Sequence, residues 1–137
     1  MVYRHHAHIA GRGTKSLRAL FPQREVTLHG ELDKIGVRDT LWQSNALVLP
    51  TRCEAQGLVL LEAMCSGLPV VTTEAVPQSV RIPGACTVVP IGDAVALADA
   101  MSHVMTLTPD PAWVEQAREV VSPQAVARRL ESIFMER

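Results

Sequence analysis

Short apolar runs rich in β-branched residues alternate along the chain with segments of helical periodicity. The apolar runs are the predicted strands, at residues 7–11, 26–30, 46–50, 69–73 and 86–90. Helical patterns follow at residues 14–21, 37–45, 57–66, 93–105, 111–121 and 123–137. Because strands that alternate with helices pair in parallel, the pattern predicts an α/β fold: one parallel sheet of about five strands, flanked by helices on both faces.

Three loops are predicted at one edge of this sheet. In open α/β sheets, ligands bind beyond the carboxyl ends of the strands. The loops that follow the first three predicted strands, at residues 11–13, 29–30 and 51–57, are rich in glycine and polar residues. We therefore expect these loops to form the rim of a binding site.

One segment, residues 53–71 (CEAQGLVLLEAMCSGLPVV), is apolar except for two glutamates eight positions apart, Glu54 and Glu62. A helix is predicted over residues 57–66, where Gly67 suits the left-handed residue after a helix and Pro69 blocks continuation. The helix has no polar stripe, which predicts that it is buried and that Glu62 needs a partner. Glu54 precedes the helix, in the loop at the carboxyl end of a strand.

Gly57 opens this helix. The first amides of a helix are unpaired and carry partial positive charge, and a glycine lets an anion approach them. Carboxylates accept hydrogen bonds from hydroxyl groups in charge-assisted bonds. The loop therefore suits a ligand with phosphates in the middle and hydroxyls at both ends, as in a nucleoside diphosphate sugar. Alternatively, Glu54 only favours the positive end of the helix, and Glu62 reaches solvent or an arginine.

Composition narrows the class of protein. The length of 137 residues fits one domain, residues 1–137, and 47% hydrophobic with 20% charged residues is typical of globular proteins. A net charge of −1 provides no basic field for nucleic acid or an anionic membrane. No apolar run approaches the roughly 20 residues that span a bilayer. The odd number of cysteines, Cys53, Cys65 and Cys86, predicts buried reduced thiols and a cytoplasmic location, with at most peripheral contact at the inner membrane face.

Residues 26–73, with the Glu54–x7–Glu62 spacing and the SGLPVV exit, resemble a known family. They are similar to the C-terminal, donor-binding domain of group 1 (family 4-type) retaining glycosyltransferases of the GT-B fold. The resemblance extends from about residue 7 to 105, and the last predicted helix resembles the family's C-terminal helix. It implies a Rossmann-like sheet that forms one half of a GT-B fold. It also implies transfer of a sugar from a nucleotide diphosphate donor to a glycan, lipid or small-molecule acceptor, with retention of configuration.

The resemblance implies roles for individual residues. Glu54 is the expected catalytic residue and contacts the hydroxyls of the donor sugar, whereas Glu62 contacts the ribose hydroxyls. The backbone amides of Gly57 and Leu58 hold the diphosphate. Gly30 lines the donor cleft near the nucleotide. No metal ion and no cofactor are expected, because stabilisation of the departing diphosphate carries the catalysis.

Three other residues of the expected rim, His29, Gln56 and Arg12, have roles that the sequence leaves open. His29 ends a predicted strand beside Gly30 and is either a ligand contact or a hydrogen-bonded loop histidine. Gln56 stands where the family commonly has an aromatic residue, which affects how a sugar packs. Arg12 is a basic residue of the first glycine loop and a candidate donor contact. Nothing in the sequence shows that it replaces the arginine and lysine with which the family grips the diphosphate.

The chain also departs from the family at its start. It begins after the family's first strand, and the N-terminal acceptor domain is absent, so we expect a missing acceptor domain or partner chain to complete the site. Two alternatives stay open. The chain is a truncated or split non-catalytic interaction module, with self-association through an unpaired sheet edge, or it belongs to another GT-B enzyme that acts on nucleotide sugars, such as an epimerase.

The histidines near the start of the chain raise one further alternative. His6 and His8 lie on one face of a predicted strand, with His5 on the other. Two imidazoles at this spacing can bind a metal ion, but no carboxylate or cysteine is evident nearby to complete the ligand set. The sequence therefore predicts solvated histidines at a strand edge.

Overall fold

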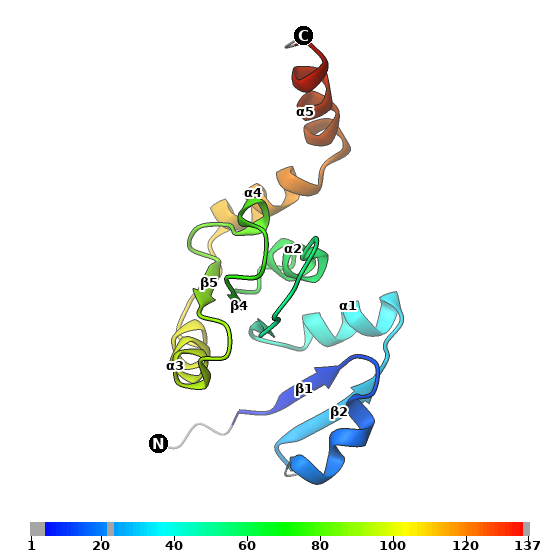
Figure 1. Cartoon of the computed structure of the whole chain (residues 1–137), viewed down its shortest axis with the longest axis vertical. Coiled ribbons are helices and arrows are strands. Elements are labelled where there is room, and N and C mark those ends of the chain that lie inside the picture. The colour runs from blue at the N-terminus through cyan, green and yellow to red at the C-terminus, as the bar shows by residue number, and fades with distance from the viewer. Residues whose placement is uncertain (1–4, 22–23, 136–137) are drawn as a thin grey trace. The chain divides into compact units, whose positions relative to one another are not determined.

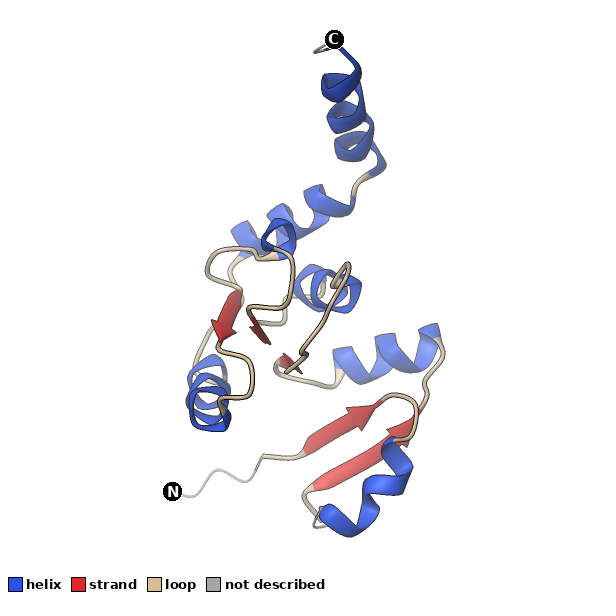
Figure 2. Ribbon diagram, in the orientation of Figure 1, coloured by secondary structure: helices blue, strands red, loops and turns tan. Residues whose placement is uncertain are grey.

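The computed structural model describes residues 5–21 and 24–135. The chain divides into two compact units, Met1–Gln43 and Ser44–Arg137, which we call unit 1 and unit 2. Each unit contains parallel strands with helices beside them (Figures 1 and 2).

Unit 1 contains two parallel strands, β1 (Ala7–Ala10) and β2 (Val26–Gly30). They are connected by the 3-10 helix η1 (Thr14–Leu20), and β2 is followed by the helix α1 (Lys34–Trp42). The predicted helix over residues 14–21 is thus a 3-10 helix. Asp33 caps α1, since its side chain accepts a hydrogen bond from the amide of Gly36.

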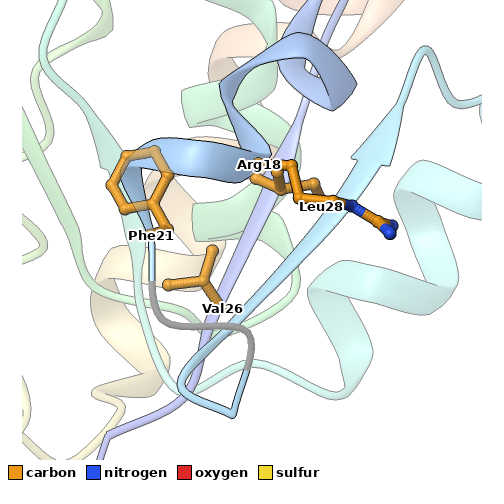
Figure 3. A pocket seen from close by; sticks show the side chains of 4 residues that line it. All are labelled: Arg18, Phe21, Val26 and Leu28. Atoms are coloured by element: carbon orange, nitrogen blue, oxygen red, sulfur yellow. The ribbon is translucent and has the colours of Figure 1, made fainter.

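One face of β2 packs against η1 and the residue that follows it. Val26 and Leu28 of β2 line a small hollow of about 30 Å³ together with Arg18 and Phe21. Figure 3 shows Phe21 above Val26, with the guanidinium of Arg18 pointing away from Phe21. Because side chains alternate between the two faces of a strand, Thr27 and His29 lie on the opposite face of β2.

Unit 2 contains a parallel sheet of three strands in the order β3-β4-β5. The strands are β3 (Leu47–Leu49), β4 (Val70–Thr73) and β5 (Cys86–Val89). The central strand β4 is buried along its whole length, as expected of a strand covered on both faces. A short 3-10 helix, η2 (Gln78–Val80), lies in the connection from β4 to β5.

Four helices complete unit 2: α2 (Leu58–Cys65), α3 (Ala94–Val104), α4 (Pro111–Val121) and α5 (Pro123–Met135). Figure 1 shows α2 and α3 on opposite sides of β4. On the α3 side, Val71 of β4 and Val89 of β5 pack against Ala100 and Val104. The helix α4 packs against α2, with Trp113 almost fully buried at 5% exposure.

The structure confirms the α/β class and all five predicted strands, which pair in parallel. It differs in one respect: the strands form a two-stranded and a three-stranded sheet, and no pairing joins β2 to β3 in the described residues. The expectation of buried cysteines is wrong for Cys53, which is exposed in the loop after β3, while Cys65 and Cys86 are half-buried. Within the described residues, no helix combines the length and apolarity needed to cross a bilayer.

Candidate functional site

The entrance of α2 is built around Gly57, the residue that caps the helix. Its backbone is left-handed, with a φ of 66° and a ψ of 31°. A Cβ at this position would lie 3.1 Å from Cγ2 of Val80, 3.3 Å from Cδ1 of Leu60 and 3.4 Å from Cγ1 of Val76. Glycine is therefore required here both by conformation and by the close approach of the segment after β4.

Glu54 folds back over the loop that leads into α2. Its Oε1 accepts hydrogen bonds from the amides of Gln56 and Gly57, each at 3.1 Å. The bonds from the amides of Gly57 and Gln56 lower the pKa of Glu54, so the carboxylate is ionised at neutral pH. The predicted carboxylate thus lies at the helix entrance, and it orders the loop through one of its two oxygens.

Glu62 lies on the surface of α2, one helical turn beyond Leu58. Its side chain is exposed, and Leu58 is 57% exposed. The expectation of a helix buried all round is therefore wrong: Leu60, Leu61, Ala63 and Met64 are buried, whereas the strip through positions 58 and 62 faces outward. The reason is that residues four apart share a helix face, and the side chains at 58 and 62 on this face are both exposed.

The backbone amides at the entrance differ in whether a protein group already accepts their hydrogen bond. The amide of Gly57, which we expected to hold a diphosphate, donates to Glu54. The amide of Leu58 opens the helix and has no acceptor in the described part of the chain. An unpaired amide at a helix N-terminus favours an anion. Among the described residues, the Leu58 amide thus has no acceptor at the helix entrance, and the Glu62 side chain is exposed one turn further along.

Two side chains that the sequence analysis did not identify hold this entrance in place. The guanidinium of Arg81 donates to the carbonyls of Glu74 and Val76, and so fixes the segment that covers Gly57. The hydroxyl of Thr73, at the end of β4, donates to the carbonyl of Thr51 in the loop before Glu54. Arginine in a loop gives no signal of such a role in the sequence, because its acceptors are backbone carbonyls.

A shallow hollow of about 180 Å³ lies at the carboxyl ends of β3, β4 and β5. Its lining includes Pro50, Arg52, Thr73, Val89, Gly92 and Asp93, but neither Glu54 nor Glu62. Arg52 thus contributes to this hollow from the same loop that carries Glu54.

In unit 1, the loops after β1 and β2 are joined by hydrogen bonds, whereas the predicted rim with the loop at residues 51–57 stays a prediction. The amide of Gly11 donates to the carbonyl of Gly30, and the amide of Gly30 donates to the hydroxyl of Thr14. A Cβ on Gly30 would lie 2.9 Å from Cε of Lys15, so the aliphatic part of the Lys15 side chain packs directly over Gly30. Arg12 points elsewhere: it is 88% exposed and forms an ion pair with Glu31, with Nη2 and Oε1 3.4 Å apart.

His29 is half-buried and is paired with another histidine. Its Nε2 shares a hydrogen bond of 3.0 Å with Nδ1 of His8. His6 binds the hydroxyl of Thr27 through Nε2, at 2.8 Å. No group of three or more metal-ligating side chains occurs in residues 5–21 and 24–135. Sequence reasoning placed His6 and His8 on one face but had no means to bring His29 beside them.

Comparison with known proteins identifies the family. Residues 2–106 match the family described as glycosyl transferases group 1, a range that contains every predicted site residue. The chain belongs to the group 1 glycosyltransferases. This assignment confirms the resemblance read from residues 26–73. No curated protein sequence matches the chain significantly.

Solved structures support the same fold. Sucrose-phosphate synthase from Thermosynechococcus elongatus is 25% identical, with a TM-score of 0.67, over 89% of this chain and 32% of that one. A structure of TarM is 20% identical, with a TM-score of 0.61, over 90% of this chain and 28% of that one. The fold is therefore the Rossmann-like half of a GT-B glycosyltransferase. The chain spans about a third of the length of these structures.

Proposed function

We propose that this chain is the donor-binding domain of a retaining glycosyltransferase, and that the entrance of α2 binds a nucleoside diphosphate sugar. The observation that carries the proposal is the arrangement at this entrance. It combines an ionised Glu54, a left-handed Gly57, an unpaired amide at Leu58 and an exposed Glu62 within one loop and the first turns of one helix.

In this proposal, the two carboxylates have different tasks. Oε1 of Glu54 accepts hydrogen bonds from the loop amides. Oε2 is therefore available to accept a hydrogen bond from a hydroxyl of the donor sugar. Glu62 accepts from the ribose hydroxyls, and the Leu58 amide approaches the diphosphate. Bonds from hydroxyls to ionised carboxylates are stronger than bonds between neutral groups.

The proposed role of these residues is to bind the donor and to stabilise the charge on its departing diphosphate. The sugar leaves a diphosphate on which negative charge develops, and backbone amides fixed at a helix N-terminus stabilise that charge without reorganising. Glu54 acts on the sugar rather than on a metal ion or cofactor, and the proposed transfer uses neither. The roles of Arg12, Gln56, His29 and Gly30 stay predictions, because no contact of theirs in unit 1 or unit 2 identifies a ligand.

In the same proposal, a further segment or a partner chain supplies the acceptor side of the site. The related structures are about three times as long as this chain, which supports a further segment or a partner chain that binds the acceptor. The three free cysteines support a cytoplasmic location for the assembled enzyme.

Calorimetric titration with UDP-, GDP- and ADP-sugars at millimolar concentration tests the proposal. We expect one nucleotide class to bind, and both Glu54→Gln and Glu62→Gln to weaken it. Glu115→Gln, on the exposed surface of α4, is the matched control and should leave binding unchanged. Absence of binding by every donor, or equal weakening by the control, would show that the entrance of α2 is not a donor site.

A further inference from the structure

Three histidines gather on one face of the two-stranded sheet in unit 1. In the register of this sheet, His8 pairs with Thr27 and Ile9 with Leu28. Val26 and Leu28 face the hollow beside Phe21, so the alternate positions face the other way. This opposite face carries His6, His8, Thr27 and His29, which we call the histidine face.

The rings of the histidine face lie in contact with one another. The ring centroids of His6 and His8 are 5.1 Å apart, in an edge-on arrangement. The ring centroids of His8 and His29 are 5.2 Å apart and the rings are stacked. His6 and His8 are exposed and His29 is half-buried, so solvent and small solutes reach the cluster.

The distance between the two nearest ring nitrogens fits a shared metal ion. Nδ1 of His8 and Nε2 of His29 are 3.0 Å apart. Two imidazoles that bind one Zn²⁺ at about 2.0–2.1 Å each place their nitrogens roughly 3.0–3.4 Å apart when they occupy neighbouring coordination positions. The spacing of the two nitrogens is therefore that of two ligands of one ion, and the rings need only turn so that both lone pairs face it.

The hydrogen bond between the two rings is also compatible with metal binding. Neutral imidazole is the form that binds metal ions. Only one of the two facing nitrogens carries a proton in the hydrogen bond. On binding, that imidazole moves its proton to its other ring nitrogen, and both facing nitrogens become ligands.

We propose that His8 and His29 form a binding site for a borderline divalent transition-metal ion such as Zn²⁺, with water in the remaining coordination positions. Imidazole ligands select ions of this class over Mg²⁺ and Ca²⁺. The ion would tie β1 to β2 through side chains that are 21 residues apart in the sequence. The proposed metal site uses none of the residues at the entrance of α2, although His29 is also a predicted donor contact.

Titration of the full chain with Zn²⁺ tests the site, and His29 is the decisive residue. A histidine-rich segment such as residues 5–8 can bind a metal ion without any fold, but His29 joins it only in the folded unit. Losing a residue that merely supports a metal ligand weakens binding about 10–100-fold, so His8→Ala and His29→Gln should each weaken Zn²⁺ binding at least tenfold. His103→Ala, an exposed histidine of α3, is the control.

Two further measurements separate loss of a metal ligand from loss of the fold. Circular dichroism of His29→Gln shows whether the variant is folded, and Thr27→Val tests the neighbouring position on the same face without removing a proposed ligand. Electron paramagnetic resonance of the Cu²⁺-loaded protein is best recorded in a His5→Ala/His6→Ala chain, which lacks the other histidines of the segment. It should show coupling to two histidine nitrogens, reduced to one when His29→Gln is added. No Zn²⁺ binding at 100-µM metal, or binding unchanged in folded His29→Gln, overturns the proposal.

Discussion

Gly57 offers the sharpest test of how the entrance of α2 is built. We consider the substitution Gly57→Ala, which adds one methyl group to a buried position. The backbone there has a φ of 66°, in the left-handed region that residues with a Cβ avoid. The added methyl would also meet Val80 at 3.1 Å, Leu60 at 3.3 Å and Val76 at 3.4 Å.

These two effects have separate magnitudes. The left-handed conformation costs a non-glycine residue roughly 1–2 kcal/mol. An extra methyl group in a well-packed core costs about 1–3 kcal/mol, because the surrounding side chains must shift. Together they predict that Gly57→Ala lowers the free energy of unfolding by about 2–5 kcal/mol, a large fraction of the roughly 5–15 kcal/mol of an ordinary domain.

Gly67→Ala separates the two effects. Gly67 follows α2, has a φ of 83°, and a Cβ there would meet only Pro109 at the ordinary contact distance of 3.8 Å. Urea denaturation of both variants, followed by circular dichroism, should show a loss of only about 1–2 kcal/mol for Gly67→Ala. If the two variants lose equal stability, the packing of Val76 and Val80 over Gly57 does not constrain the entrance, and the reasoning is refuted.

Substitutions at three other residues probe the same region. Arg81→Met removes the bonds to carbonyls in the segment after β4 and should cost about 1–3 kcal/mol in urea denaturation, with Arg81→Lys intermediate. Thr73→Val should lower the free energy of unfolding by about 1–3 kcal/mol, because the carbonyl of Thr51 loses its hydrogen-bond donor. An unchanged urea midpoint would contradict this. The pKa of Glu54 lies below its ordinary value of 4.5 in the folded state, so its stabilising effect is present above that pH and is lost as pH falls through the folded value. The free energy of unfolding should therefore depend less on pH in the acid range for Glu54→Gln than for the parent chain.

Local patterns in the sequence predicted most of the secondary structure. The strand at residues 26–30 has the predicted bounds, and the helix over residues 57–66 is observed as Leu58–Cys65 with Gly57 and Ser66 as caps. These elements are set by short-range chemistry: β-branched runs, a left-handed glycine and a proline that stops a helix. The 3-10 conformation of residues 14–20 was not predicted, because its pattern of apolar positions resembles that of an α-helix.

The candidate site was predicted in part. The spacing of Glu54 and Glu62 around Gly57 placed the correct residues at one helix entrance. It did not show that Glu54 accepts a hydrogen bond from the amide of Gly57. That bond leaves the amide of Leu58 as a donor without an acceptor among the described residues. Hydrogen bonds of this kind depend on the path of the loop, and side-chain type alone does not determine that path.

The sequence by itself determined the α/β alternation, the five strands, the family and the acidic pair at the entrance of α2, because each is encoded in neighbouring residues or in short spacings. Only the tertiary structure decided which distant groups meet. The hydroxyl of Thr73 reaches the carbonyl of Thr51, and His29 lies beside His8 across two paired strands. Strand register and loop path, which depend on packing of the whole unit, create these contacts.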